Sequence, residues 1–188
     1  MLRRVVGSLA VLAVAVACWI GARIGGGDIA TPVAHRASEV PLLATDGRTV
    51  RLADGPRVIV FGYVGCADWC PLTLGALSRA AAARPARFPR ITFVDCDPWT
   101  DSVAVVRRYV RHFPGVQGAT GDARSLVANE VALGMRPISR PAEVADHDSR
   151  VFVVDREGVL VGTIAPSQPS GDLASRLEAI LASSTRWL

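Results

Sequence analysis

The chain has 188 residues, of which half are hydrophobic, and this suits one domain of ordinary size plus a short extra segment. All 21 basic residues are arginine; three of them flank an apolar N-terminal segment, whereas all 17 acidic residues lie beyond it. The net charge of +4 therefore overstates the charge of the remainder, which is nearly neutral. Because nucleic-acid binding needs clustered basic residues in excess, we expect no nucleic-acid partner.

Residues 1–23 form the apolar segment, and Arg3 and Arg4 lie at its start. Its part without charged residues, 5–22, is apolar except for Gly7, Ser8 and Gly21, and it is about as short as a helix that crosses a bilayer can be. Arginines before such a run stay in the cytoplasm and place the rest of the chain outside it. We therefore expect an uncleaved, single-pass anchor in the inner membrane, with the C-terminal domain on the periplasmic or extracytoplasmic side. A removed signal peptide and a lipoprotein signal ending before Cys18 are the alternatives.

Residues 24–39 contain three consecutive glycines and a proline, which is the composition of a linker. The folded domain is expected over residues 40–188, and its elements are predicted from apolar periodicity and turn residues. These elements are a hairpin over 40–53, a strand over 57–64, a helix over 71–83, a strand over 91–95, helices over 102–113 and 122–133, an ordered loop over 135–148, strands over 151–154 and 159–164, and a helix over 173–181. This order predicts an α/β fold, a mixed sheet flanked by helices.

Two cysteines, Cys66 and Cys70, lie where the strand over 57–64 ends and a helix is expected to start at Pro71. The partial positive charge of a helix amino end favours thiolate over thiol, so both cysteines are expected to be activated. A purely structural disulfide across so small a loop would add little stability. We interpret the pair as a redox-active dithiol or as part of a soft-metal site.

A metal site with two thiolates would suit Cu(I) or zinc and would normally take a histidine as its third ligand. His35 lies in the linker, and His112 lies on the predicted outer face of a helix. His147 precedes the strand over 151–154, and it would lie near the cysteines if that strand ran antiparallel beside the strand over 57–64. From position alone, His147 is either a metal ligand or an ordinary surface histidine.

Three segments of the chain resemble motifs of the Sco/SenC copper-chaperone family. Residues 62–71, GYVGCADWCP, resemble its copper motif, in which a glycine, an aromatic residue and a Cys-Pro-Asp-aliphatic-Cys-Pro run recur. The family's Val-Asp-Pro-x-x-Asp segment is matched at Asp97, Pro98 and Asp101. Residues 147–158 resemble its histidine segment, and the resemblance extends from about residue 40 to the carboxyl end.

The resemblance implies a thioredoxin-like fold, with copper as Cu(I) or Cu(II) bound by Cys66, Cys70 and His147. It also implies a role in building the copper centre of cytochrome c oxidase. The implied partners are the copper-bearing oxidase subunit, a copper donor protein and the membrane that holds the N-terminal helix. Such a protein is a metallochaperone and not an enzyme in the turnover sense.

Two other functions remain open. A thiol–disulfide oxidoreductase would need only Cys66 and Cys70 and would reduce cysteines of a periplasmic or oxidase-subunit target. Peroxide reduction in the manner of peroxiredoxins is a third class, which leaves His147 unexplained. The discriminating residue is therefore His147.

The chain departs from the family motif at Ala67, Trp69 and Val64, which replace the usual proline, aliphatic residue and threonine. These changes bear on copper affinity and redox potential, and they leave the ligands intact. Cys96 lies outside the family pattern, at the end of a strand expected to run parallel to the strand over 57–64. It is either a buried free cysteine or an alternative disulfide partner and auxiliary thiolate.

Overall fold

The computed structural model describes residues 35–85, 88–165 and 171–183. The predicted membrane anchor over residues 1–23 and most of the predicted linker lie outside these ranges. No helix in the described part of the chain is long and apolar enough to cross a membrane. The backbone N–H of Leu160 donates to the carbonyl of His35 at 2.8 Å, and that of Ala37 donates to Gly158 at 2.8 Å. The last residues assigned to the linker therefore run beside the domain.

Within the described residues, one sheet of seven strands has the order β2-β1-β5-β4-β3-β6-β7. The central pairs β3–β4 and β4–β5 are parallel, and the remaining neighbours are antiparallel. The fold is thus α/β with a mixed sheet, as predicted. The elements are β1 Leu42–Ala44, β2 Thr49–Val50, β3 Arg57–Gly62, α2 Trp69–Ala83, β4 Arg90–Asp95, α3 Val103–Val110, β5 Val116–Thr120, α4 Ala123–Ala132, the 3-10 helix η1 Pro141–Asp146, β6 Val151–Val154, β7 Leu160–Ile164 and α5 Gly171–Ser183.

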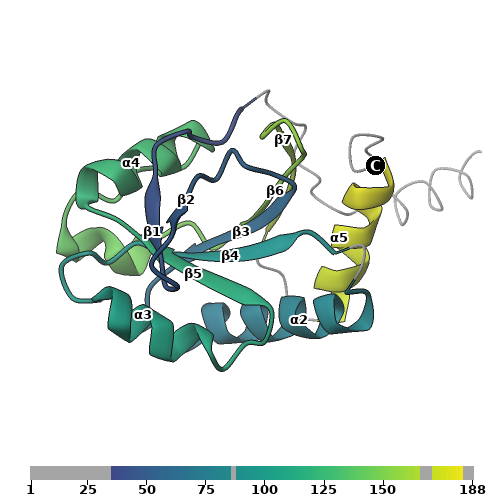
Figure 1. Cartoon of the computed structure of the whole chain (residues 1–188), viewed down its shortest axis with the longest axis horizontal. Coiled ribbons are helices and arrows are strands. Elements are labelled where there is room, and N and C mark those ends of the chain that lie inside the picture. The colour runs from purple at the N-terminus through teal and green to yellow at the C-terminus, as the bar shows by residue number, and fades with distance from the viewer. Residues whose placement is uncertain (1–34, 86–87, 166–170, 184–188) are drawn as a thin grey trace, which may run out of the picture.

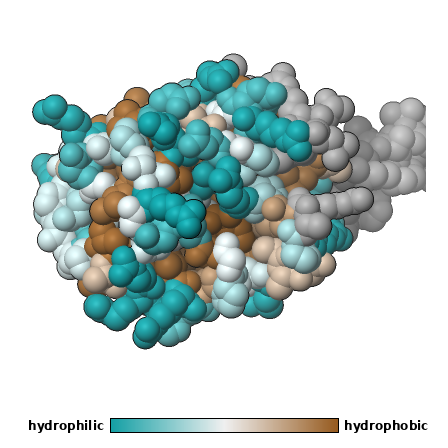
Figure 2. Space-filling model, viewed as in Figure 1, coloured by the Kyte–Doolittle hydropathy of each residue, from teal (hydrophilic) through white to brown (hydrophobic). Residues whose placement is uncertain are grey.

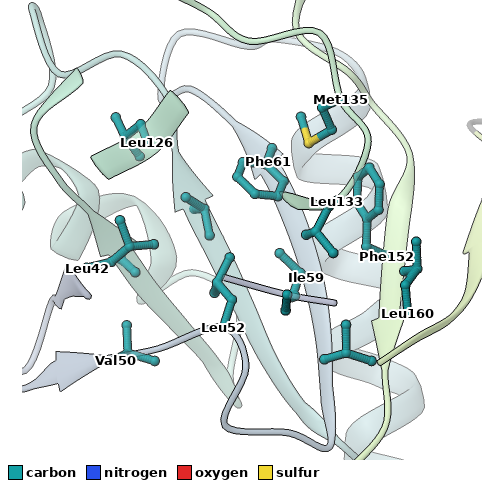
Figure 3. Close-up of a cluster of buried hydrophobic side chains, with 14 of the residues drawn as sticks. Leu42, Val50, Leu52, Ile59, Phe61, Leu126, Leu133, Met135, Phe152 and Leu160 are labelled. Carbon is teal, nitrogen blue, oxygen red and sulfur yellow. The ribbon is translucent and has the colours of Figure 1, made fainter. Parts of the chain in front are cut away.

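Helices cover both faces of the sheet, with α2, α3 and α5 on one side and α4 on the other (Figure 1). The central strand β3 is buried along its whole length, as expected for a strand covered on both faces. One core cluster packs β3 and β4 against α2, α3 and α5. A second cluster lies on the α4 side, where Figure 3 shows Phe61, Leu133 and Met135 close together. The C-terminal end of β3 is therefore held from both sides.

The surface seen in Figure 2 is largely hydrophilic, with hydrophobic residues visible between the hydrophilic ones. Among the described residues, the large hydrophobic side chains that remain exposed are Leu43, Leu72, Trp99 and Val131. Leu72 lies in the first turns of α2, and Trp99 lies in the loop that follows β4. Both thus belong to segments that leave the sheet at the carboxyl ends of its parallel strands.

The structure corrects the predicted boundaries around the cysteines. β3 ends at Gly62 and not at residue 64, and α2 begins at Trp69, ahead of Pro71. Pro71 occupies the third helical position, which is tolerated because backbone N–H groups in the first turn have no partner within the helix. The predicted helix start was therefore two residues late.

Two further corrections concern the connections. Strand β5 was not predicted, because its sequence, Val-Gln-Gly-Ala-Thr, shows no clear alternation of apolar residues. Gly118 in this strand allows two neighbours to come close. A Cβ at Gly118 would lie 2.7 Å from Cγ2 of Thr45, which follows β1, and 3.0 Å from Cγ1 of Val106 in α3. The loop expected over residues 135–148 contains the 3-10 helix η1.

Candidate metal centre

The two cysteines lie where the chain leaves β3 and enters α2. Cys66 is half-buried in the connecting loop, and Cys70 is buried in the first turn of the helix. His147, which caps the C-terminal end of η1, completes a group with them. The candidate ligand atoms of Cys66, Cys70 and His147 all lie within 4.8 Å of one another.

The close approach of Cys70 to the end of β3 depends on Gly62. A Cβ at Gly62 would lie 2.4 Å from Cys70 Sγ and 3.0 Å from the ring of Phe93. Real Cβ atoms do not come so close to other heavy atoms, and Phe93 is fully buried. The Cys70 sulfur can therefore occupy this position only because residue 62 has no side chain.

His147 reaches the cysteines because β6 pairs antiparallel with β3, the condition on which its expected position depended. Its Nε2 lies 3.8 Å from Cys70 Sγ, and its Nδ1 lies 3.2 Å from the carbonyl oxygen of Val144. The Tyr63 ring contacts the imidazole edge-on, with ring centroids 5.3 Å apart. A neutral imidazole that donates its Nδ1–H to Val144 keeps the Nε2 lone pair directed at the sulfur, which is how a metal-binding histidine is commonly oriented.

Burial sets the protonation of the group. It lowers the pKa of His147, although the hydrogen bond to Val144 acts in the opposite direction. Burial, and then the neighbouring Cys66, raise the pKa of the Cys70 thiol well above its ordinary value. The expectation of an activated Cys70 is thus wrong, because loss of solvation favours the neutral thiol. A metal that binds here would have to displace the Cys70 proton.

Two aspartates lie near the start of the cysteine loop. The Asp101 carboxylate accepts a hydrogen bond from the backbone N–H of Val64 at 3.0 Å. Asp95 is fully buried at the end of β4, and burial, followed by the Asp101 charge, raises the pKa of Asp95 to about 8. Asp101 was identified from its motif, whereas Asp95 was missed. An acidic residue directly after the apolar run over 91–94 was the available signal.

Cys96 is not one of the three grouped residues. It is fully buried, its Sγ donates to the carbonyl of Gly62 at 2.9 Å, and it packs with Ile138 and Val144. Cys70, in contrast, packs in the cluster beneath α2. This placement favours the interpretation of Cys96 as a buried free cysteine, and the auxiliary role stays a hypothesis.

The other two histidines are not near the cysteines in the described part of the chain. His112 is exposed beyond the end of α3, and His35 is half-buried beside Gly134. Neither of them was predicted as a metal ligand from the sequence. The group of two thiols and one imidazole is therefore formed by the three residues that the motifs indicated, and it has the donor set that suits Cu(I) or zinc.

The mixed sheet and the thiol pair between β3 and α2 define a thioredoxin-like protein with a candidate metal centre. The family model described as SCO1/SenC matches residues 33–182. The chain therefore belongs to the SCO1/SenC family.

Two relatives and one solved structure illustrate the similarity. The chain is 27% identical to the protein SCO1, mitochondrial, of Saccharomyces cerevisiae over 117 residues, which are 57% of this chain and 40% of that protein. It is also 27% identical to a putative copper-binding protein of Stutzerimonas stutzeri over 124 residues, 61% of each chain. The matches thus span about two to three fifths of these relatives. The copper-bound structure of Bradyrhizobium japonicum ScoI has the same fold, with a TM-score of 0.64 at 24% identity over 77% of this chain and 99% of that chain.

Proposed function

We propose that the protein is a membrane-anchored copper chaperone that helps to assemble the copper centre of cytochrome c oxidase. Cys66, Cys70 and His147 bind the copper, and the N-terminal segment over residues 1–23 holds the domain on the extracytoplasmic side of the membrane. Membership of the SCO1/SenC family and the similarity to a protein named as a putative copper-binding protein support this proposal. The observation that carries it is the convergence of the three ligand atoms within 4.8 Å.

Copper is the cargo in this proposal, taken from a donor protein and released to the copper-bearing oxidase subunit. Two thiolates and one imidazole leave copper short of the four ligands common in closed metal sites, so an incoming ligand of the recipient has access. Cys66 is half-buried, whereas Cys70 is buried, so Cys66 is the ligand that an incoming group reaches first. Transfer then proceeds by stepwise exchange of ligands.

The alternative function, thiol–disulfide exchange, is favoured by the proximity of the same two thiols. The Cys66 thiolate would attack a target disulfide, form a mixed disulfide and release one target sulfur as a thiolate. This thiolate would take the Cys70 proton, and the Cys70 thiolate would attack the Cys66 sulfur, which closes the Cys66–Cys70 disulfide and releases the second target sulfur as a thiolate. This route makes no use of His147.

The two functions separate in a copper titration of the purified, reduced full chain under anaerobic conditions. We expect one copper per chain, and His147→Ala should weaken binding by more than the roughly 10- to 100-fold that loss of a ligand's hydrogen-bond partner costs. Exchange with a small disulfide should be unchanged in the same variant. His112→Ala, which removes an exposed histidine, is the matched control. Absence of copper uptake by the wild type would refute the chaperone function.

A further inference from the structure

The segment that carries His147 connects α4 to β6, and we call residues 135–147 the His147 segment. Its apolar side chains Met135, Ile138 and Val144 are buried. The Glu143 carboxylate accepts hydrogen bonds from Ser139 and Arg140, so these polar contacts bind the segment to itself. They do not determine where the segment lies on the domain.

Polar contacts between the His147 segment and the rest of the domain converge on one residue of α4, Glu130. The carbonyl of Glu130 accepts from the Met135 N–H at 3.0 Å, and its Oε2 accepts from the Ile138 N–H at 2.8 Å. Apart from the contact of His147 with Cys70, these are the hydrogen bonds that tie the segment to other described parts of the chain. Of the two hydrogen bonds to Glu130, the one from the Ile138 N–H is accepted by the Glu130 side chain.

Glu130 is an unexpected residue at this position. It is fully buried on α4, between the buried Leu126 of the same helix and the buried Leu133 at its C-cap, where an apolar side chain such as leucine is expected. Its Oε1 is buried and has no hydrogen-bond partner among the described residues. Because burial of a carboxyl group with one unsatisfied oxygen is unfavourable, the group is poorly explained by stability alone.

From Ile138 the contacts lead directly to the imidazole. Ile138 and Val144 form one small cluster with Cys96, and Tyr63 packs against it. The carbonyl of Val144 accepts from the backbone N–H of His147 at 3.2 Å and also faces its Nδ1 at 3.2 Å. The position of Val144 therefore fixes both the backbone and the ring of His147.

We propose that Glu130 is a positioning residue for His147, and that its carboxylate fixes the His147 segment through the Ile138 N–H. Without this acceptor, the buried N–H of Ile138 has to find water, and the segment moves away from Tyr63 and the cysteines. The effect on copper rests on the proposed function. The effect on the imidazole does not, because it concerns the metal-free protein.

Three variants of the full chain test the proposal. Glu130→Leu removes the acceptor but fills the space with an apolar side chain, Glu130→Gln retains an acceptor without the charge, and Asn129→Ala is the matched control. Asn129 is also fully buried on α4, but its side-chain amide donates to the carbonyls of Val40 and Ser125 and makes no hydrogen bond to the His147 segment among the described residues. Nuclear Overhauser effects between the Tyr63 and His147 rings report the imidazole position in the metal-free protein.

We expect Glu130→Leu to lose the ring contact, to expose the Ile138 amide to hydrogen exchange, and to bind copper roughly 10- to 100-fold more weakly. Its thermal midpoint should stay near that of the wild type, because an unfavourable buried carboxyl is removed. Glu130→Gln should retain the contact between the Tyr63 and His147 rings and the copper affinity. Asn129→Ala should lower the thermal midpoint but leave the ring contact and the copper affinity unchanged.

Retention of the ring contact in Glu130→Leu, or its equal loss in Asn129→Ala, would overturn the positioning role. A wild type that shows the ring contact but takes up no copper would remove the proposed function and leave the positioning role standing. In the His147→Ala background, Glu130→Leu should cause no further loss of copper affinity, since the two residues act in one chain of contacts. A further loss there would contradict the proposal.

Discussion

The two halves of the candidate metal centre are supported in different ways. The cysteine half, residues 62–70, directly continues the central strand β3, which is paired on both sides and leads into a helix. The histidine half, residues 135–147, is a connection with a short 3-10 helix, and Glu130 provides the hydrogen bonds that tie it to α4. We infer that the cysteine half keeps its geometry when the histidine half is displaced, and that changes in either half can be measured separately.

The largest expected effect on stability concerns Asp95, which lies beside Gly62 in the neighbouring strand β4. Its pKa is raised from 3.8 to about 8, so between these pH values the folded state holds a proton that the unfolded chain has lost. The stability that this proton provides is present below about pH 4 and is lost as the pH rises to about 8.

Asp95→Asn should remove this pH dependence and be more stable than the wild type at pH 8 by a few kcal/mol, since one pKa unit corresponds to about 1.4 kcal/mol. Urea denaturation at pH 5 and pH 8 measures the difference, and Asp46→Asn, in an exposed turn, is the control. The contact between the Tyr63 and His147 rings should be unchanged. Equal slopes with pH in wild type and Asp95→Asn would contradict this account of Asp95.

A smaller effect on stability is expected at Gly62. In Gly62→Ala the new Cβ would lie 2.4 Å from Cys70 Sγ, so Cys70 must move and copper binding should be severely weakened. Overpacking of this kind costs about 1–3 kcal/mol of folding free energy. Guanidinium denaturation and copper titration check both outcomes.

Gly75→Ala is the comparison within α2, where the new Cβ meets only Arg79 Nη1, at 3.4 Å. It should stabilise the protein by about 0.5–1 kcal/mol, because alanine is the better helix former, and leave the copper affinity unchanged. If Gly62→Ala and Gly75→Ala changed stability and copper affinity alike, the proposed steric role of Gly62 beside Cys70 would be wrong.

The same contrast explains what could be predicted from the sequence. Cys66, Cys70 and Pro71 form a local pattern at the end of an apolar run, so the strand, the turn and the helix followed directly. The antiparallel pairing of β6 with β3 was an assumption that the structure confirms, and it brings His147 to Cys70. The local pattern and this pairing therefore place His147 beside the cysteines, and the resemblance to the family motifs then selected it as the third ligand.

What was missed depends on contacts between distant residues. The raised pKa of Cys70 follows from burial of its side chain in the core at the start of α2, which the charge of a helix terminus does not reveal. Glu130 is an acid on an otherwise apolar face, with Leu126 four residues before it and Leu133 three after it. That pattern could have marked Glu130 as buried, but its partner, the Ile138 N–H, is visible only in the folded chain.

The central claim is that Cys66, Cys70 and His147 bind copper together. X-ray absorption at the copper edge, on the reduced full chain loaded with one copper, tests it most directly. We predict a first coordination sphere of two sulfur atoms and one imidazole nitrogen, and loss of the imidazole signal in His147→Ala with both sulfur atoms retained. A sphere without imidazole in the wild type, or an imidazole signal that persists in His147→Ala, would contradict the claim.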